Sequence, residues 1–341
     1  MDDENRNIFV ANWLLLITFF VALMIVVGGL TRLTDSGLSI TKWDLVSGIL
    51  PPITLEDWNE AFTLYKQIPE FKEVNFSMSL SEFKVIYWWE YAHRLLGRII
   101  GLLYLIPLIY FTIKKKIPRK SIVSFYSIFI LILIQGIIGW YMVKSGLVDR
   151  VDVSHYRLSL HLTLAFIIFI LLFWNYLKYS NKDKLADFKI LPYNLLNIFL
   201  ILLLIQISFG ALVSGLDAGQ IYQSWPLMNG SYFPNDANFK DLASRDFLNI
   251  PSLVQFLHRN IAYIISFLFL IIFFIIFKNN EYSYLRKSTL VVLFFLLLQI
   301  FLGILTILSG AQIILASMHQ IGSILLVAST LILIFKNSKI N

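Results

Sequence analysis

The main pattern in this chain is a succession of long apolar segments separated by polar connections. Each apolar segment reaches or exceeds roughly 20 residues, which is enough to cross about 30 Å of hydrocarbon as a helix. The pattern predicts eight transmembrane helices, over residues 8–30, 86–112, 121–143, 157–177, 193–215, 256–277, 289–309 and 312–335. The expected fold class is therefore all-α, a polytopic membrane protein whose main contact is lipid.

The composition supports a membrane protein. Of the 341 residues, 58% are hydrophobic and 14% are charged, which is too little charge to cover the surface of a soluble protein. The chain has no cysteine, which excludes disulfides, thiolate metal sites and thiol redox chemistry. It begins Met1-Asp2-Asp3-Glu4, an acidic start unlike a signal peptide or a mitochondrial transit peptide. We therefore expect the inner membrane of a bacterial cell.

Basic residues concentrate in the connections that follow the even-numbered helices and in the C-terminal tail. Such segments remain in the cytoplasm, so both termini are expected there and the loops 31–85, 144–156 and 216–255 outside. Topology accounts for most of the net charge of +7, and no nucleic-acid partner is indicated. The residues concerned are Lys114, Lys115, Lys116, Arg119, Lys120, Lys178, Lys182, Lys184, Lys189, Lys278, Arg286, Lys287, Lys336 and Lys339.

Motifs of the first four helices recur in the same order in the last four. The recurring pairs are Asp35-Ser36-Gly37 with Asp217-Ala218-Gly219, His93-Arg94 with His258-Arg259, Gln135-x-x-x-Gly139 with Gln299-x-x-x-Gly303, and His161 with His319. Each copy has an even number of helices, so both copies share one orientation. The sequence predicts two pseudo-symmetric four-helix bundles, residues 1–190 and 191–341. Gln135, Gln206 and Gln299 are interpreted mainly as interhelical hydrogen-bonding residues beside close glycine contacts.

Four of the five histidines lie on the even-numbered helices, four to seven residues past each expected start, which places them about 6–10 Å below the outer surface. They are His93, His161, His258 and His319. Ionisable residues inside a membrane face a bundle interior and are functional candidates. Paired imidazoles from facing helices suit the iron of a haem, whereas zinc usually takes more protein ligands. The alternative is a histidine that only hydrogen-bonds between helices. His155 is expected to be solvated or interfacial.

Three arginines follow these histidines on the same helices, namely Arg94, Arg98 and Arg259. Arginine forks bind carboxylates in a bidentate manner, and haem propionates are carboxylates. These arginines are therefore candidates for binding a haem cofactor. The alternative is that their side chains extend to the membrane interface.

The two halves differ beside the first histidine of each. Glu90 lies three residues before His93, whereas Gln255 lies three residues before His258. Positions three apart share a helix face, so Glu90 is expected to face whatever His93 binds. A carboxylate there can accept a proton or stabilise developing positive charge. The first half is predicted to be chemically active and the second to hold a permanent cofactor. The alternative is that Glu90 only pairs with Arg94.

These residues bring the chain close to a known family, because it resembles haem A synthase, most of all the branch shared by α-proteobacteria and mitochondria. The match covers nearly the whole chain in order. The segments that carry it are Gly28-Gly29-Leu30-Thr31-Arg32-Leu33-Thr34, Ser36-Gly37-Leu38-Ser39, Trp43, Pro51-Pro52, Pro69-Glu70-Phe71, Glu90-Tyr91-Ala92-His93-Arg94-Leu95-Leu96-Gly97-Arg98, Val153-Ser154-His155-Tyr156-Arg157 with His161, Gly215-Leu216-Asp217-Ala218-Gly219, Trp225-Pro226-Leu227-Met228, His258-Arg259 and His319-Gln320.

The resemblance implies an oxidoreductase that converts the C8 methyl group of haem O to a formyl group by successive hydroxylations, giving haem A for cytochrome c oxidase. It implies that His93 and His161 hold the substrate haem O, that Glu90 is the catalytic carboxylate, and that His258 and His319 ligate a haem b cofactor. Haem O synthase and cytochrome oxidase assembly factors are the expected partners, and a homo-oligomer is left open. Another branch carries cysteine pairs in its outer loops, and this chain has none.

Two other functions compete with this one. A di-haem b-type electron-transfer subunit, similar to a quinol oxidoreductase, would use all four histidines for permanent haems and would need no catalytic role for Glu90. A transporter or haem-delivery protein would also fit a repeat with polar groups inside the helices, but transport sites usually lie near the midplane. The four histidines are expected closer to one face.

Overall fold

The computed structural model describes residues 3–42, 47–180 and 190–338. The first two residues, Trp43 and the basic residues Lys182, Lys184, Lys189 and Lys339, which entered the sequence interpretation, lie outside the described residues. The chain divides into two compact units. One is Leu16–Ile168, and the other combines Met1–Leu15 with Phe169–Asn341.

The described residues contain eight helices that are long and apolar enough to cross a membrane, which confirms the all-helical class and the eight spans. They are α1 (Asp3–Leu33), α4 (Leu80–Ile113), α5 (Arg119–Asp149), α6 (His155–Ser180), α7 (Leu195–Gly215), α8 (Pro251–Lys278), α9 (Arg286–Leu308) and α10 (Ile313–Asn337). Shorter elements lie in the connections: η1 (Ser47–Ile49), α2 (Leu55–Tyr65), α3 (Pro69–Glu73), η2 (Pro192–Asn194), η3 (Ala218–Gln220), η4 (Phe239–Ala243), η5 (Phe247–Asn249) and η6 (Asn280–Leu285). The repeat symmetry stays a prediction.

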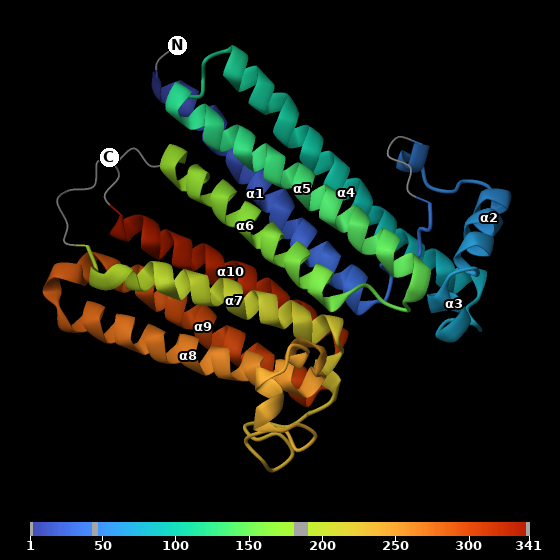
Figure 1. The fold of residues 1–341 in the computed structure, drawn as a ribbon. Coiled ribbons are helices and arrows are strands. Elements are labelled where there is room, and N and C mark those ends of the chain that lie inside the picture. The colour runs from blue at the N-terminus through green and yellow to red at the C-terminus, as the bar shows by residue number, and fades with distance from the viewer. Residues whose placement is uncertain (1–2, 43–46, 181–189, 339–341) are drawn as a thin grey trace. The chain divides into compact units, whose positions relative to one another are not determined.

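In the unit Leu16–Ile168, the long helices lie side by side, and the connection between α1 and α4 carries the short helices α2 and α3 (Figure 1). The buried hydroxyl of Tyr104 donates a hydrogen bond of 2.9 Å to the carbonyl of Phe125 and so joins α4 to α5. Such a bond satisfies a phenol that would otherwise lack water inside a membrane.

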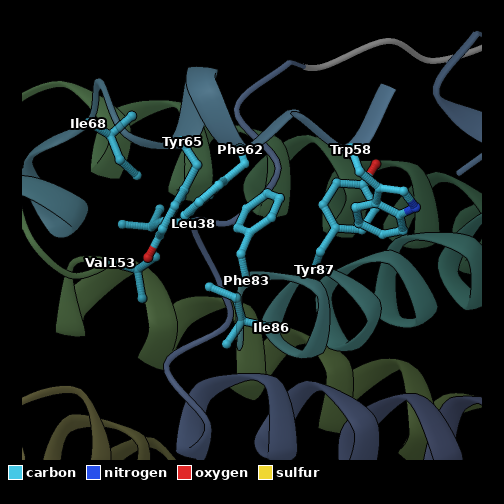
Figure 2. Close-up of a cluster of buried hydrophobic side chains, with 9 residues drawn as sticks. All are labelled: Leu38, Trp58, Phe62, Tyr65, Ile68, Phe83, Ile86, Tyr87 and Val153. Carbon is cyan, nitrogen blue, oxygen red and sulfur yellow. The ribbon is translucent and has the colours of Figure 1, made fainter. Parts of the chain in front are cut away.

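Aromatic side chains cover one end of this unit. Tyr65 and Phe83 are fully buried, and the ring of Phe62 stacks on Phe83 with centroids 5.0 Å apart (Figure 2). We call this cluster the aromatic cap, and it consists of Leu38, Trp58, Phe62, Tyr65, Ile68, Phe83, Ile86, Tyr87 and Val153. The long loop therefore packs on the first turns of α4, and this packing orders the chain beside the site described below.

The start of α4 differs from the prediction. Hydropathy places it at residue 86, but the helix begins at Leu80, because Ser79 and Glu82 form a capping box. Such a box satisfies the first backbone N–H groups of a helix through side chains. His93 thus lies thirteen residues after the helix start, so its expected spacing of four to seven residues was wrong. His161, His258 and His319 lie six or seven residues after theirs.

In the unit that holds α7 to α10, each helix contacts its neighbours in sequence, and α10 closes against α7 to complete a four-helix arrangement (Figure 1). The connection between α7 and α8 folds over the first turns of α8. There Tyr222 and Met228 are buried against Phe256.

Glu70 is a buried acid next to the aromatic cap. Its ionisation makes the stability of the cap depend on pH. The residue is 5% exposed, and its Oε2 atom has no hydrogen-bond partner among the described residues. Burial, followed by the negative charges of Glu90, Asp152 and Asp35, raises the pKa of Glu70 to about 8. The folded cap therefore binds this proton more tightly than the unfolded segment does.

We expect the aromatic cap to loosen as the pH rises. The stabilisation from protonated Glu70 is complete below its ordinary pKa of 4.5 and is lost as the pH rises through about 8, where the folded group ionises. Hydrogen exchange of the α2 amides, corrected for intrinsic rates, should accelerate from pH 6 to pH 9 in the wild type and stay constant in Glu70→Gln. An equal acceleration in both proteins would contradict this assignment.

Candidate functional site

Each of the four membrane histidines packs against a glycine of the preceding long helix. A β-carbon placed on that glycine would lie between 2.8 and 3.3 Å from Cε1 of the imidazole, so a larger residue would displace the ring. The pairs are Gly28 with His93, Gly139 with His161, Gly210 with His258 and Gly303 with His319. The rings therefore lie against neighbouring helices inside their units, as expected of functional residues in a membrane.

The histidines are paired within each unit. His93 lies close enough to His161 for the rings to interact electrostatically, and His258 lies equally within reach of His319. The Nδ1 atoms of all four are buried and have no hydrogen-bond partner among the described residues. Buried polar atoms normally have partners, so four unpaired ring nitrogens show that the protein alone does not satisfy these imidazoles.

The donor set of each pair suits a haem. Within the described ranges, no group of three or more His, Cys, Asp or Glu side chains could hold a metal ion. Two imidazoles are too few for the usual zinc site, but they can fill both axial positions of an iron whose other positions belong to a porphyrin. The residues present in each unit therefore fit a haem.

Glutamines four residues before the glycines lie beside the histidines. Nε2 of Gln135 donates to the backbone carbonyl of His161 at 3.0 Å, and Nε2 of Gln206 donates to the carbonyl of His258 at 3.0 Å. The interpretation of these glutamines as interhelical hydrogen-bonding residues is confirmed. The amides fix the relative height of two helices at the level of each histidine.

Glu90 is the most enclosed acid of the site, with 2% of its surface exposed. Its Oε2 accepts hydrogen bonds of 2.7 Å from the Ser39 hydroxyl and from the backbone N–H of Ile40. Its Oε1 accepts from Nε of Arg94 at 3.0 Å and from Nη2 at 2.5 Å. The pairing with Arg94, which the sequence left as the alternative, is therefore present. A catalytic role for Glu90 stays a prediction.

The other unit repeats this arrangement with one chemical change. Nη2 of Arg94 donates to the carbonyl of Ile40 at 2.9 Å, and Nη2 of Arg259 donates to the carbonyl of Tyr222 at 3.0 Å. Ile40 and Tyr222 each follow by five residues an aspartate in the left-handed conformation, with φ of 47° and 49°. However, Gln255 donates an amide N–H to Tyr222, where Glu90 accepts two bonds from the loop. Only the first unit has a carboxylate here.

Sequence reasoning missed the part that Ser39 plays. Its hydroxyl binds Glu90, and its side chain is 2% exposed. The repeat held a signal, because the position equivalent to Ser39 in the second copy is Ile221, which cannot hydrogen-bond through its side chain. The hydroxyl is therefore present in the unit that has the carboxylate and absent from the other, which indicates that Ser39 orients Glu90.

Two arginines have surroundings that suit an anion. Arg259 is buried at 7% exposure, and its Nε and Nη1 atoms have no hydrogen-bond partner in the described chain. A buried guanidinium without an acid is costly, so this group fits a ligand carboxylate such as a haem propionate. Arg98 lines a pocket of about 270 Å³ together with Arg94 and Lys42. Its role as a propionate ligand stays a prediction.

Comparison with known proteins identifies the family. The COX15-CtaA family, described as a cytochrome oxidase assembly protein, matches residues 11–331. Over 339 residues the chain is 50% identical to the heme A synthase of Pelagibacter ubique, with 99% of each chain covered. It is 44% identical over 321 residues to that of Rickettsia bellii, covering 93% of this chain and 94% of the relative, and 40% identical over 349 residues to that of Flavobacterium johnsoniae, covering 99% and 100%.

The chain belongs to the COX15-CtaA family. The resemblance to haem A synthase stated from the sequence is confirmed, because the match to proteins of that name extends over the full length. Membership in this family implies that haem is involved in the protein's function. The histidine pairs and the unpaired guanidinium atoms of Arg259 are the features that fit a haem.

His155 was expected to be solvated or interfacial. The solvated position is wrong, because the residue is 6% exposed where α6 begins. Its ring packs on Tyr156 with centroids 4.1 Å apart. The neighbouring residues Val153 and Ser154 are buried as well, so the connection before α6 folds inward instead of extending into water.

Proposed function

We propose that this chain oxidises the C8 methyl group of haem O to a formyl group by successive hydroxylations, with haem O held between His93 and His161. Full-length homology gives the reaction class, an oxidoreductase that converts haem O to haem A. The observation that carries the assignment of the substrate site is the difference between the units: a buried Glu90 lies three residues before His93, whereas Gln255 lies three residues before His258.

Glu90 and its partners have distinct tasks in this proposal. The carboxylate stabilises positive charge that develops while the methyl group is oxidised, and it receives protons that leave. Both of its oxygens already accept two hydrogen bonds, so a proton can bind only when one donor withdraws. Ser39 is suited to this, because a hydroxyl rotates and can accept as well as donate. Arg94 holds the carboxylate in place meanwhile.

The second histidine pair would hold the permanent cofactor, a haem b. His258 and His319 would hold it, and Arg259 would supply a cation for a propionate. When bound there, a haem b would supply single-electron transfer. No acid stands where Glu90 stands in the first unit, which agrees with a site that binds its group without transforming it.

The charge pattern predicts the orientation of the protein in its membrane, and the substrate predicts its partners. We infer that it lies in a bacterial inner membrane with both termini in the cytoplasm, because the basic connections favour that side. Haem O is too apolar to diffuse through water, so haem O synthase should deliver it by direct contact. Cytochrome oxidase assembly factors would receive the product. A homo-oligomer is compatible with these contacts.

The electron-transfer alternative is less well supported. It would give both histidine pairs permanent haems and would need no catalytic role for Glu90. The transporter alternative finds no support in the comparisons, because the full-length relatives are named as heme A synthases.

The proposed function is tested in cells that make haem O but no haem A. Expression of this chain should produce haem A among the extracted haems, identified by chromatography and mass. His93→Ala and His161→Ala should each abolish haem A and leave haem O. If wild-type protein accumulates in the membrane with bound haem and no haem A appears, the proposed reaction is wrong.

A further inference from the structure

One position breaks the pattern around the four histidines. In α5, α7 and α9 a glutamine stands four residues before the glycine that contacts a histidine. In α1, Met24 stands four residues before Gly28. The exception therefore belongs to His93, one of the two proposed ligands of the substrate.

The three glutamines fasten their histidines to the neighbouring helix. Gln135 and Gln206 donate to the backbone carbonyls of His161 and His258, each at 3.0 Å. The Gln206 amide also lies 3.2 Å from the ring Nε2 of His258, and that of Gln299 lies 3.4 Å from the ring Nε2 of His319. Each of these three histidines therefore makes a polar contact with a glutamine of the neighbouring helix.

Met24 stands at the equivalent position of α1 but makes no such contact. Its Cε lies 3.3 Å from a β-carbon placed on Gly97, one turn beyond His93 on α4. A thioether has no hydrogen to donate, and no side-chain amide in the described chain binds His93. Among the hydrogen bonds described between α1 and α4, one runs from the Thr31 hydroxyl to the carbonyl of Trp89 at 3.5 Å, one turn before His93.

We propose that Met24 is a positioning residue that makes His93 the releasable ligand of the substrate site. The inference rests on the proposed function, in which the haem at the first pair must leave after each reaction while that at the second pair stays. Both histidines of the second pair are fastened by glutamines. In the first pair the Gln135 amide binds His161, whereas no such amide among the described residues binds His93, so the imidazole of His93 is the ligand that withdraws and lets the product go, while Glu90 and Arg94 keep α4 in place.

The structure suggests that a glutamine can replace Met24. The two side chains are of similar length, and Gly97 opposite Met24 offers room. In the second unit, Gly322 offers the same room to Gln299, whose Oε1 lies where a β-carbon on that glycine would be. Met24→Gln should therefore reach the carbonyl of His93 and fasten it. Interhelical hydrogen bonds in membranes have a modest average strength, so we expect an effect of about threefold.

The test measures haem release directly. Full-length protein in lipid nanodiscs, carrying haem O in the first site and haem b in the second, is mixed with excess apomyoglobin, and the haem transferred is identified by chromatography over time. Met24→Gln should release haem O about threefold more slowly than the wild type, and Met24→Leu should release it at the wild-type rate. Gln135→Met, which frees His161, should release haem O faster. Release of haem b should not change in any of them.

The outcomes separate this inference from the proposed function. If the wild-type protein binds no haem O that depends on His93 and His161, the proposed function fails. If it binds haem O and Met24→Gln releases it at the wild-type rate, only the role of Met24 is overturned. Should Met24→Gln fail to fold, an unchanged release rate in Gln135→Met would overturn it as well. A lower kcat with unchanged or lower KM in Met24→Gln, but not in Met24→Leu, would support it.

Discussion

Replacing Glu90 by glutamine is expected to reduce haem A formation by at least about a hundredfold, which is the lower range for loss of a general acid or base. The glutamine keeps the size of the side chain and can still accept from Ser39 or Ile40, but it carries no charge and cannot take up a proton. The haem b of the second unit should remain bound, because its ligands lie on α8 and α10. The measurement is haem extraction from cells that make haem O, normalised to the amount of protein in the membrane.

A second variant separates catalysis from simple charge pairing. Glu90→Gln alone leaves Arg94 as a buried, unpaired cation, and breaking a buried pair in this way costs roughly 3–5 kcal/mol. The double variant Glu90→Gln with Arg94→Gln removes both charges. If the double variant folds, binds haem b and stays inactive, Glu90 is needed for the reaction. Recovery of haem A formation would show that Glu90 serves only to neutralise Arg94. Gln255→Glu is the matched change in the other unit and should not create a second active site.

Removal of either histidine of the second pair should remove haem b and with it haem A formation. His258→Ala and His319→Ala each leave one imidazole where the proposed haem b site needs two. Haem O should still bind, because His93 and His161 belong to the other unit. Haem b content per protein, measured as the pyridine adduct after purification, checks the first part, and chromatography of extracted haems checks the second. A variant that lacks haem b and still makes haem A would contradict the proposed electron-transfer role.

Substituting a glycine that contacts a histidine tests the haem b site without removing the imidazole. A β-carbon on Gly303 would lie 2.9 Å from Cε1 of His319, whereas one on Gly136 has no neighbour within 4 Å. Gly303→Ala should therefore displace the imidazole and lower haem b content, and Gly136→Ala should leave it unchanged. Equal haem b content in both variants would show that the close approach of α9 to His319 does not position the ligand.

The sequence was sufficient for the number of helices and for singling out the four histidines that the structure places inside the two units. Eight apolar segments can cross a bilayer only as helices, so hydropathy alone predicts them. Histidines are rare inside membranes, and four of them in a repeated pattern were therefore visible without coordinates. The difference between Glu90 and Gln255 was also visible, because the repeat provides its own internal comparison.

Hydropathy could not predict how the connections close over the site. Residues 80–85 include Glu82 and Lys84 and are not apolar, so the early start of α4 follows from its capping box and from packing in the aromatic cap. The contacts of Ser39 and Ile40 with Glu90 join residues about fifty positions apart. Such contacts depend on the path of a loop, which no local pattern determines. The inward position of His155 was missed for the same reason.

The packing of each histidine on a glycine was predicted only in part. The spacing Gln-x-x-x-Gly indicated close helix contact, but the partner of each glycine depends on which helices are neighbours and at what height. Only the structure shows that the partner is a histidine in all four cases. It also shows that Met24 takes the place of a glutamine beside His93. A substitution of this kind becomes visible once the four glycines are aligned.

The most direct test of the account is an experimental structure of the protein purified from cells that make haem O, with the iron atoms located by anomalous scattering. Two iron atoms are expected, one between the imidazoles of His93 and His161 and one between those of His258 and His319. Chromatography of the same sample should show haem O or haem A together with haem b. An iron bound outside these pairs, or a first pair that holds no iron while haem A is being made, would contradict the account.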